Sequence, residues 1–163
     1  MKPKTTLPLP PLRFTAHWED PADAALLVER ALVLRAESVG RNPELLLTFT
    51  CSLVKDYDAT YLRERTLLLR SWNLNGVALG SGRLPHPAAL EEALQRQGGL
   101  DPLAATLLTH FLTDALREAV PMAEGLVSAG HTRRPRSIAR QRWSQLQEWC
   151  RRAERTLPPD LLA

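Results

Sequence analysis

The chain has 163 residues, of which 44% are hydrophobic and 24% charged, and its formal net charge is +3. This length fits one domain whose core can fold without disulfides or metals, and the composition excludes a wholly disordered chain or a fibrous repeat. No run of about eighteen apolar residues is present, and prolines interrupt the N-terminal segment where a signal peptide would be apolar. We therefore expect a cytoplasmic protein with no membrane contact.

The first part of the chain predicts an extended arm and then a strand. Residues 1–12 are rich in proline and lack the pattern of a packed element. In the following stretch, "RFTAHW", Phe14, Ala16 and Trp18 alternate with polar residues. This period of two is typical of a half-buried strand.

The next two segments carry helix and strand signals. Over residues 20–39, Asp20 and Pro21 provide a helix start and Gly40 follows the end, so we predict a helix there. Residues 44–54 allow two interpretations. Their alternation and threonines favour a strand, whereas the stripe Leu46, Phe49 and Leu53 fits a helix. We favour the strand.

Residues 61–74 carry the same ambiguity between helix and strand. An Asn-Gly pair at residues 75–76 favours the strand, because it predicts a tight β-hairpin. A two-residue turn there would place Leu74 opposite Val77 and Trp72 opposite Leu79, so that apolar side chains meet across the two strands. The glycines around this turn match neither a dinucleotide-binding motif nor a Walker loop. We therefore interpret the loop as structural and not as a phosphate site.

The later part of the chain predicts helices. One runs over residues 87–97, and a second starts at Asp101 and Pro102 and is interrupted by Pro121. An exposed basic linker and a boundary near residue 130 follow. The last helix begins at Ser137 and has apolar residues at alternating spacings of four and three, which is a heptad seam: Ala139, Trp143, Leu146, Cys150, Ala153 and Leu157.

These elements give a mainly helical α+β domain over residues 1–130, with a small antiparallel sheet that contains the hairpin. Residues 131–163 add a basic linker and a C-terminal amphipathic basic helix. This segment holds eight arginines against three acidic residues, so it carries +5 and the rest of the chain −2. The basic character of the protein therefore belongs to its C-terminal segment.

The residue types that carry catalysis are present but lack the expected patterns. None of the four histidines has a recognisable partner, although His110 and Asp114 lie one helical turn apart. Cys51 and Cys150 are distant in sequence and belong to no C-x-x-C pair. We therefore predict a non-enzymatic protein without a cofactor or a metal site.

Two binding surfaces remain, both in the C-terminal segment. The seam residues Trp143, Leu146, Cys150 and Leu157 need an apolar partner, which is either another protein, a second copy, or the body of this chain. The first two options predict an assembly factor that forms oligomers. The alternative is an accessory protein that binds DNA or RNA without sequence preference, through Arg133, Arg134, Arg136, Arg140, Arg142, Arg151 and Arg152.

The stretch "LLLRSWNLNGVALGSGRLPHPAALEEAL" resembles a segment of small tail assembly chaperones of long-tailed phages. In both, an aliphatic run ends in a Trp-Asn-Leu-like triplet, and a glycine-containing loop leads to a proline and a helix-rich segment. The resemblance covers about residues 62–116, and it implies a phage or prophage assembly factor with a helix where the hairpin is predicted. The usual acidic loop is replaced by "NGVALGSG", and residues 131–163 match nothing. The resemblance rests on Leu67 to Leu69, Trp72, Asn73, Leu74, Gly76, Pro85 and Leu90.

Overall fold

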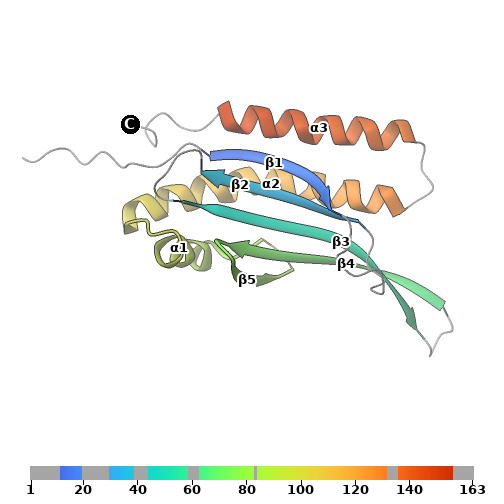
Figure 1. The fold of residues 1–163 in the computed structure, drawn as a ribbon, viewed down its shortest axis with the longest axis horizontal. Coiled ribbons are helices and arrows are strands. Elements are labelled where there is room, and N and C mark those ends of the chain that lie inside the picture. Colours follow the sequence, from blue (N-terminus) through green and yellow to red (C-terminus); the bar gives the residue numbers. More distant parts are fainter. Residues whose placement is uncertain are drawn as a thin grey trace, which may run out of the picture.

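A computed structural model describes residues 12–19, 30–38, 44–58, 63–82, 84–131 and 136–155. The chain first forms five strands and then three helices (Figure 1). The strands are β1 (Leu12–Glu19), β2 (Ala31–Ser38), β3 (Leu46–Asp58), β4 (Arg63–Leu74) and β5 (Val77–Ser81). The helices are α1 (Pro87–Arg96), α2 (Pro102–His131) and α3 (Arg136–Arg155).

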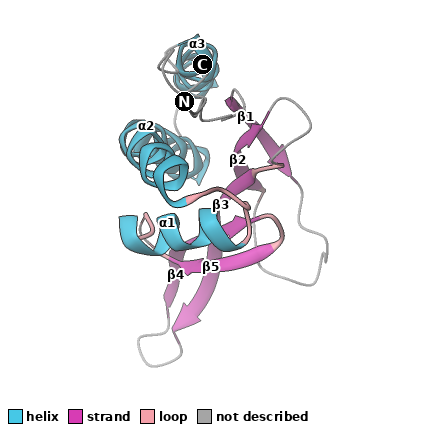
Figure 2. Ribbon diagram, turned by 90° about the vertical axis from the view of Figure 1, so that its left-hand side faces the viewer, coloured by secondary structure: helices cyan, strands magenta, loops and turns pink. Residues whose placement is uncertain are grey.

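The five strands form one antiparallel sheet in the order β1-β2-β3-β4-β5. All three helices lie on the same side of this sheet (Figure 2). Helix α2 packs over β2 and β3, α3 packs along β1 and α2, and α1 lies between α2 and β5. Of the described elements, none covers the opposite side, which we call the open face.

Alternate residues along each strand face the helices and form the core. In β1 these are Leu12, Phe14 and Ala16, all of which are buried. The register continues this face across the sheet, since Phe14 pairs with Ala36 and Ala36 pairs with Leu47. The prediction of a half-buried strand over residues 13–18 is thus confirmed, as is the strand interpretation of residues 44–54.

Aromatic rings pack against each other within the sheet and between the sheet and the helices. Phe49 of β3 lies beside the fully buried Trp72 of β4, with ring centroids 4.5 Å apart. The indole N–H of Trp72 donates to the carbonyl of Gly82 at 3.2 Å, so its one polar atom is satisfied inside the core. Phe14 of β1 meets Phe111 of α2 at 6.2 Å.

The hairpin predicted at residues 75–76 is present. Asn75 and Gly76 have φ angles of 51° and 85°, which is the left-handed backbone that a tight hairpin turn requires. Leu74 lies opposite Val77 as expected. A bulge between Trp72 and Asn73 shifts the next pairs, so Trp72 lies opposite Gly80 and not Leu79. The helix that the family resemblance implies for this stretch is absent, because residues 63–74 form β4.

The side chain of Asn75 ties this turn to two other elements. Its Oδ1 accepts from the backbone N–H of Leu46 at 2.7 Å, and its Nδ2 donates to the carbonyls of Glu44 and Gln97, each at 2.9 Å. Asn75 therefore links the β4–β5 turn to the start of β3 and to the end of α1.

The description as a mainly helical domain with a small sheet is wrong. The sheet has five strands of 8, 8, 13, 12 and 5 residues, and the fold is α+β with a full helical layer on one side. Part of the error lies at residues 31–38, which were predicted to be the end of a helix but form β2. Both faces of β2 contain buried apolar residues, Val33 on one and Leu32 and Leu34 on the other, so the alternation that distinguishes a strand is lost. The predicted helix start at residues 20–29 lies outside the described residues.

The helical predictions for the later part are confirmed except at one proline. Helix α1 matches the expected range, and the Asp101 side chain caps α2 by accepting from the N–H of Ala104 at 2.9 Å. However, α2 continues through Pro121 to His131. Proline has no backbone N–H, so the carbonyl of Arg117, four residues earlier, receives no helical hydrogen bond. Both Pro121 and Arg117 are exposed, so water can bind this carbonyl instead.

None of the described helices combines the length and the apolar character needed to cross a membrane.

Candidate functional site

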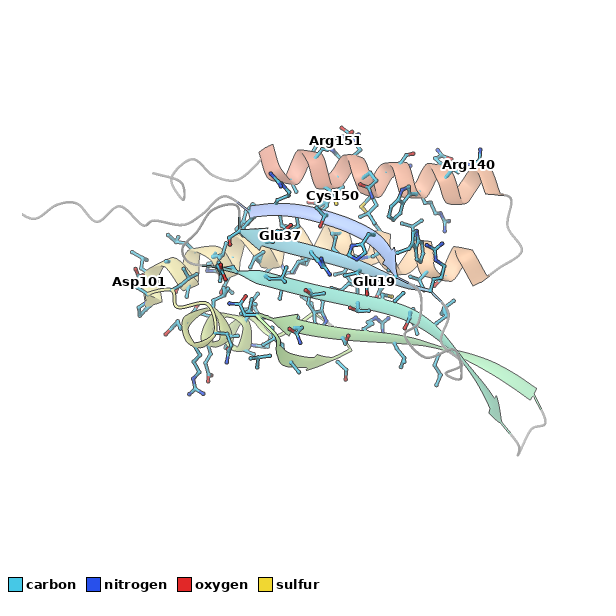
Figure 3. All side chains as sticks on the ribbon, viewed as in Figure 1. Glu19, Glu37, Asp101, Arg140, Cys150 and Arg151 are labelled. Carbon is cyan, nitrogen blue, oxygen red and sulfur yellow. The ribbon has the colours of Figure 1, made fainter. Side chains whose placement is uncertain are left out.

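The apolar seam of α3 lies against the body of the same chain. Leu146 is fully buried, Cys150 is buried, and Trp143 is partly buried against the core. Figure 3 shows Cys150 on the side of α3 that faces the sheet, with Arg140 and Arg151 on the outer side. Of the three partners that the sequence allows for this seam, its own chain is the one in contact here. Leu157 lies outside the described residues.

Contacts between α3 and β1 cover the outer edge of the sheet at that strand. Trp143 stacks on Trp18 with ring centroids 6.0 Å apart, and Trp149 meets Phe14 edge-on at 5.1 Å. The Gln147 side chain donates to the carbonyl of Ala16 at 3.2 Å. Trp149 is buried and extends the seam, but it falls outside the heptad positions, so the spacing rule missed it.

The basic cluster is only partly within the described structure. Arg133 and Arg134 lie outside it, and no side chain is described for Arg136. Of the others, Arg142 donates to the Gly125 carbonyl at 3.3 Å, and Arg151 pairs with Glu148 on the helix surface. Two further arginines, Arg140 and Arg152, are exposed on α3. An ion pair and an internal hydrogen bond thus engage half of the described arginines in this cluster.

Two of the histidines considered as general bases, His17 and His86, have other partners. His86 caps α1, since its Nδ1 accepts from the N–H of Ala88 at 3.1 Å. His17 lies 3.0 Å from Glu19 on the open face. Asp114 lies 3.8 Å from Arg117, so its charged neighbour is an arginine rather than His110. These contacts support the stability of helices and strands, and they orient none of these side chains toward a nucleophile.

Both cysteines are free and buried. Burial raises the pKa of the Cys51 thiol to about 12, with the Glu124 carboxylate adding to the rise and Arg70 opposing it. Burial likewise raises the pKa of Cys150 to about 11. Because the thiolate is the reactive form, both side chains are poor nucleophiles near neutral pH. Within the described residues, histidine, cysteine and acidic side chains form no group that could hold a metal.

A shallow depression of about 440 Å³ lies at one end of the sheet, lined by Glu37, Ser38, Glu44, Leu45, Leu46 and Asn75. Two of its polar side chains, those of Ser38 and Asn75, are occupied within the chain. The Ser38 hydroxyl accepts from the N–H of Leu45 at 2.9 Å, and the Asn75 amide makes the three bonds given above. Neither of these two side chains is therefore free to bind a ligand in this depression.

The open face exposes leucines at its β4 side. Leu67 and Leu69 are 42% and 49% exposed, and Leu46 at the start of β3 is 37% exposed. Elsewhere on this face, Val33 and Ser52 are buried, with exposures of 2% and 6%. The apolar surface that remains available therefore lies along β4, beside the position where β5 ends.

Along β4 itself, one side of the backbone lacks a neighbouring strand. Strand β5 pairs with β4 only from Ser71 to Leu74, and the N–H of Gly82 then donates to the carbonyl of Arg70 at 3.3 Å. Over residues 63–69, no strand among the described residues pairs with this side, which we call the β4 edge. The Arg70 side chain points to the helical layer, where it pairs with Glu124 of α2.

Comparison with protein family models, curated proteins and solved structures found no significant match. The resemblance to tail assembly chaperones therefore stays a prediction.

Sequence reasoning missed the open face and the β4 edge as a site. A signal was present, because the run Leu67–Leu69 places apolar side chains on both faces of one strand. Such a run is typical of a strand covered on both sides. It could not be used without knowing that β4 lies next to a strand as short as β5.

Proposed function

We propose that this protein is a non-enzymatic assembly factor that binds another protein through the leucines on the open face of its sheet. The observation that carries the proposal is the exposure of Leu67 and Leu69, by 42% and 49%, on the β4 side of the open face. Contiguous exposed apolar patches mark protein interaction sites, and Leu67 and Leu69 are neighbours on one face of β4.

The engagement of the α3 seam within the chain supports this location. Leu146 and Trp149 are buried against the body, so a partner that used them would first have to displace α3. Leu67 and Leu69 require no such opening. The proposal retains the phage or prophage context implied by the family resemblance, and a cytoplasmic location, as parts of the hypothesis.

A photo-crosslinking experiment with a matched control tests the proposal. A benzophenone amino acid replaces Leu69 in one variant and Leu103 in another, since Leu103 of α2 is 58% exposed but lies on the helical layer. A protein that is crosslinked at position 69 and not at 103 is then purified, and its affinity for the wild-type chain is measured by calorimetry.

We expect L69K to weaken this affinity by at least about tenfold, because a charge in an apolar contact must be desolvated, whereas L103K leaves it within about twofold. Equal crosslinking at the two positions, or equal affinities of L69K and the wild type, would contradict the proposal.

The alternative function is sequence-independent binding of nucleic acid by the C-terminal segment. The observation in its favour is that Arg140 and Arg152 are exposed on the outer side of α3. Fluorescence anisotropy with a labelled oligonucleotide tests it, since binding through phosphates must weaken steeply as salt rises. We expect R140Q/R152Q to reduce the salt dependence of binding if this function holds, and no binding at low salt would exclude it.

A further inference from the structure

The backbone along the β4 edge has hydrogen-bonding groups that no described strand pairs. The carbonyl of Arg70 points to the side where Gly82 lies, because Gly82 donates to it at 3.3 Å. The pairing of β3 with β4 runs without a bulge from residue 63 to residue 74, so backbone groups alternate regularly between the two sides. The N–H and C=O groups of Thr66 and Leu68 therefore face the β4 edge and not β3.

The side chains along this edge are apolar on both faces of the sheet. Leu67 and Leu69 lie on the open face, and Leu68 is partly buried against the core on the helical face. Folded proteins usually blunt an exposed strand edge with a charge, a proline or a bulge, and Leu67–Leu69 contains none of these. Unpaired donors and acceptors between apolar side chains are complementary to an extended backbone that carries apolar side chains of its own.

The β4 edge of a second copy of this chain does not fit here. If the leucines of two antiparallel copies faced each other, residue 66 of one copy would lie opposite Arg70 of the other, where Gly82 and β5 already lie. If the pairing were centred on residue 66 to avoid β5, the leucines would face Arg65 and Arg63. A parallel pair would bring the β5 strands of both copies to the same end of the contact. The occupant that the edge favours therefore belongs to a different chain.

We propose that the partner protein supplies an extended segment that pairs with the β4 edge as an additional strand of the sheet. The inference rests on the proposed function, since it specifies how the protein that contacts Leu67 and Leu69 is held. Thr66 and Leu68 each offer one N–H and one C=O, so a segment that runs in either direction can form a ladder with them. The side chains of the segment on the open face then lie beside Leu67 and Leu69, and we expect them to be apolar. The segment ends or turns away before Arg70, whose carbonyl is already bonded.

The shape of the molecule leaves this edge accessible. The distal ends of β3 and β4 extend past the ends of α2 and α3 (Figure 1), so the helical layer does not obstruct an added strand there. The contact is small, because it consists of a short backbone ladder and two half-exposed leucines. Standard interfaces bury about 800 Å² per partner, so we expect a weak complex with a dissociation constant in the micromolar range.

Calorimetric titration of two variants of the full chain, T66P and T66A, with the protein crosslinked at position 69 tests the inference. T66P removes an N–H that faces the β4 edge and leaves the β3–β4 bonds intact, whereas T66A keeps the N–H. Because an acceptor of the added strand loses its donor, T66P should raise the dissociation constant by at least about tenfold and T66A by no more than about twofold. Equal affinities of T66P, T66A and the wild type would overturn the inference. If L69K still weakened binding in that case, the proposed function would stand without it.

A second measurement keeps the test decisive if T66P does not fold, which circular dichroism would reveal. In the wild-type chain, amide hydrogen exchange at Thr66 and Leu68 should slow by at least about tenfold when the crosslinked protein is in excess. The N–H of Leu103 lies in the first turn of α2 and is the control, since its exchange should not change. Unchanged exchange at both Thr66 and Leu68 would overturn the inference. If no protein is crosslinked at position 69, the proposed function and the inference fail together.

Discussion

The two edges of the sheet differ in what lies beside them. At β1, helix α3 runs along the edge strand, and Gln147 bonds to an outward carbonyl of Ala16. At β4, the neighbouring β5 has five residues and ends before half of β4 is paired. Unpaired strand edges associate readily, so folded proteins usually cover or interrupt them. The difference indicates that one edge is closed to partners and the other is available.

The closed edge depends on aromatic packing more than on polar contacts. Three of the four aromatic ring pairs in the described structure involve β1, and two of these reach α3 through Trp143 and Trp149. Burial of a large aromatic side chain contributes more free energy than one exposed or partly exposed hydrogen bond. We therefore expect loss of an aromatic ring to affect this edge most.

W149A should have the largest effect among the variants considered. Trp149 is buried and meets Phe14 edge-on, so its removal leaves a cavity between α3 and β1. We expect the free energy of unfolding, measured by urea denaturation, to fall by about 3 to 5 kcal/mol. W143A is the control, and its effect should be smaller because Trp143 is only partly buried. A loss below about 1 kcal/mol for W149A would mean that α3 does not seal the edge.

N75A should have an intermediate effect, and it tests the side of the sheet that lies away from β1. It removes the three side-chain bonds that hold the β4–β5 turn, and it places alanine at a φ of 51°. We expect a loss of about 2 kcal/mol in the free energy of unfolding, since the strained backbone costs about 1 kcal/mol and the bonds contribute the rest. N75G restores the backbone freedom and should recover about half of the loss. Equal losses for N75A and N75G would show that the backbone conformation is not a cost there.

The sequence could predict those parts of the fold whose signals are local. The Asn-Gly pair predicts its own turn, and the alternation from Phe14 to Trp18 predicts β1, because both patterns depend on neighbouring residues. The failure at β2 has a non-local cause, since Val33 is buried on the open face and hides the alternation. The continuation of α2 through Pro121 depends on which side of the helix faces solvent, and the local pattern does not specify this.

The candidate site was harder to predict for the same reason. The seam of α3 could be found from its spacing, but the choice between an external partner and the chain's own β1 is a matter of tertiary packing. Leu67 and Leu69 carry an apolar pattern that a covered strand would share. Whether they are exposed depends on where β5 ends. Gly80 and Gly82 signal that the second strand of the hairpin ends or bulges near them, but they do not specify how the pairing with β4 shifts.

Q147A should have the smallest effect and separates two ways of closing the β1 edge. It removes the bond from Gln147 to the Ala16 carbonyl and leaves the aromatic contacts in place. We expect a loss of about 0.5 to 1.5 kcal/mol in the free energy of unfolding and no change in self-association, because packing of α3 still excludes a second strand. Q145A is the matched control, since Gln145 is exposed on the same helix and should be neutral. If Q147A instead created a new association that L69K does not prevent, the hydrogen bond and not the packing would be what closes this edge.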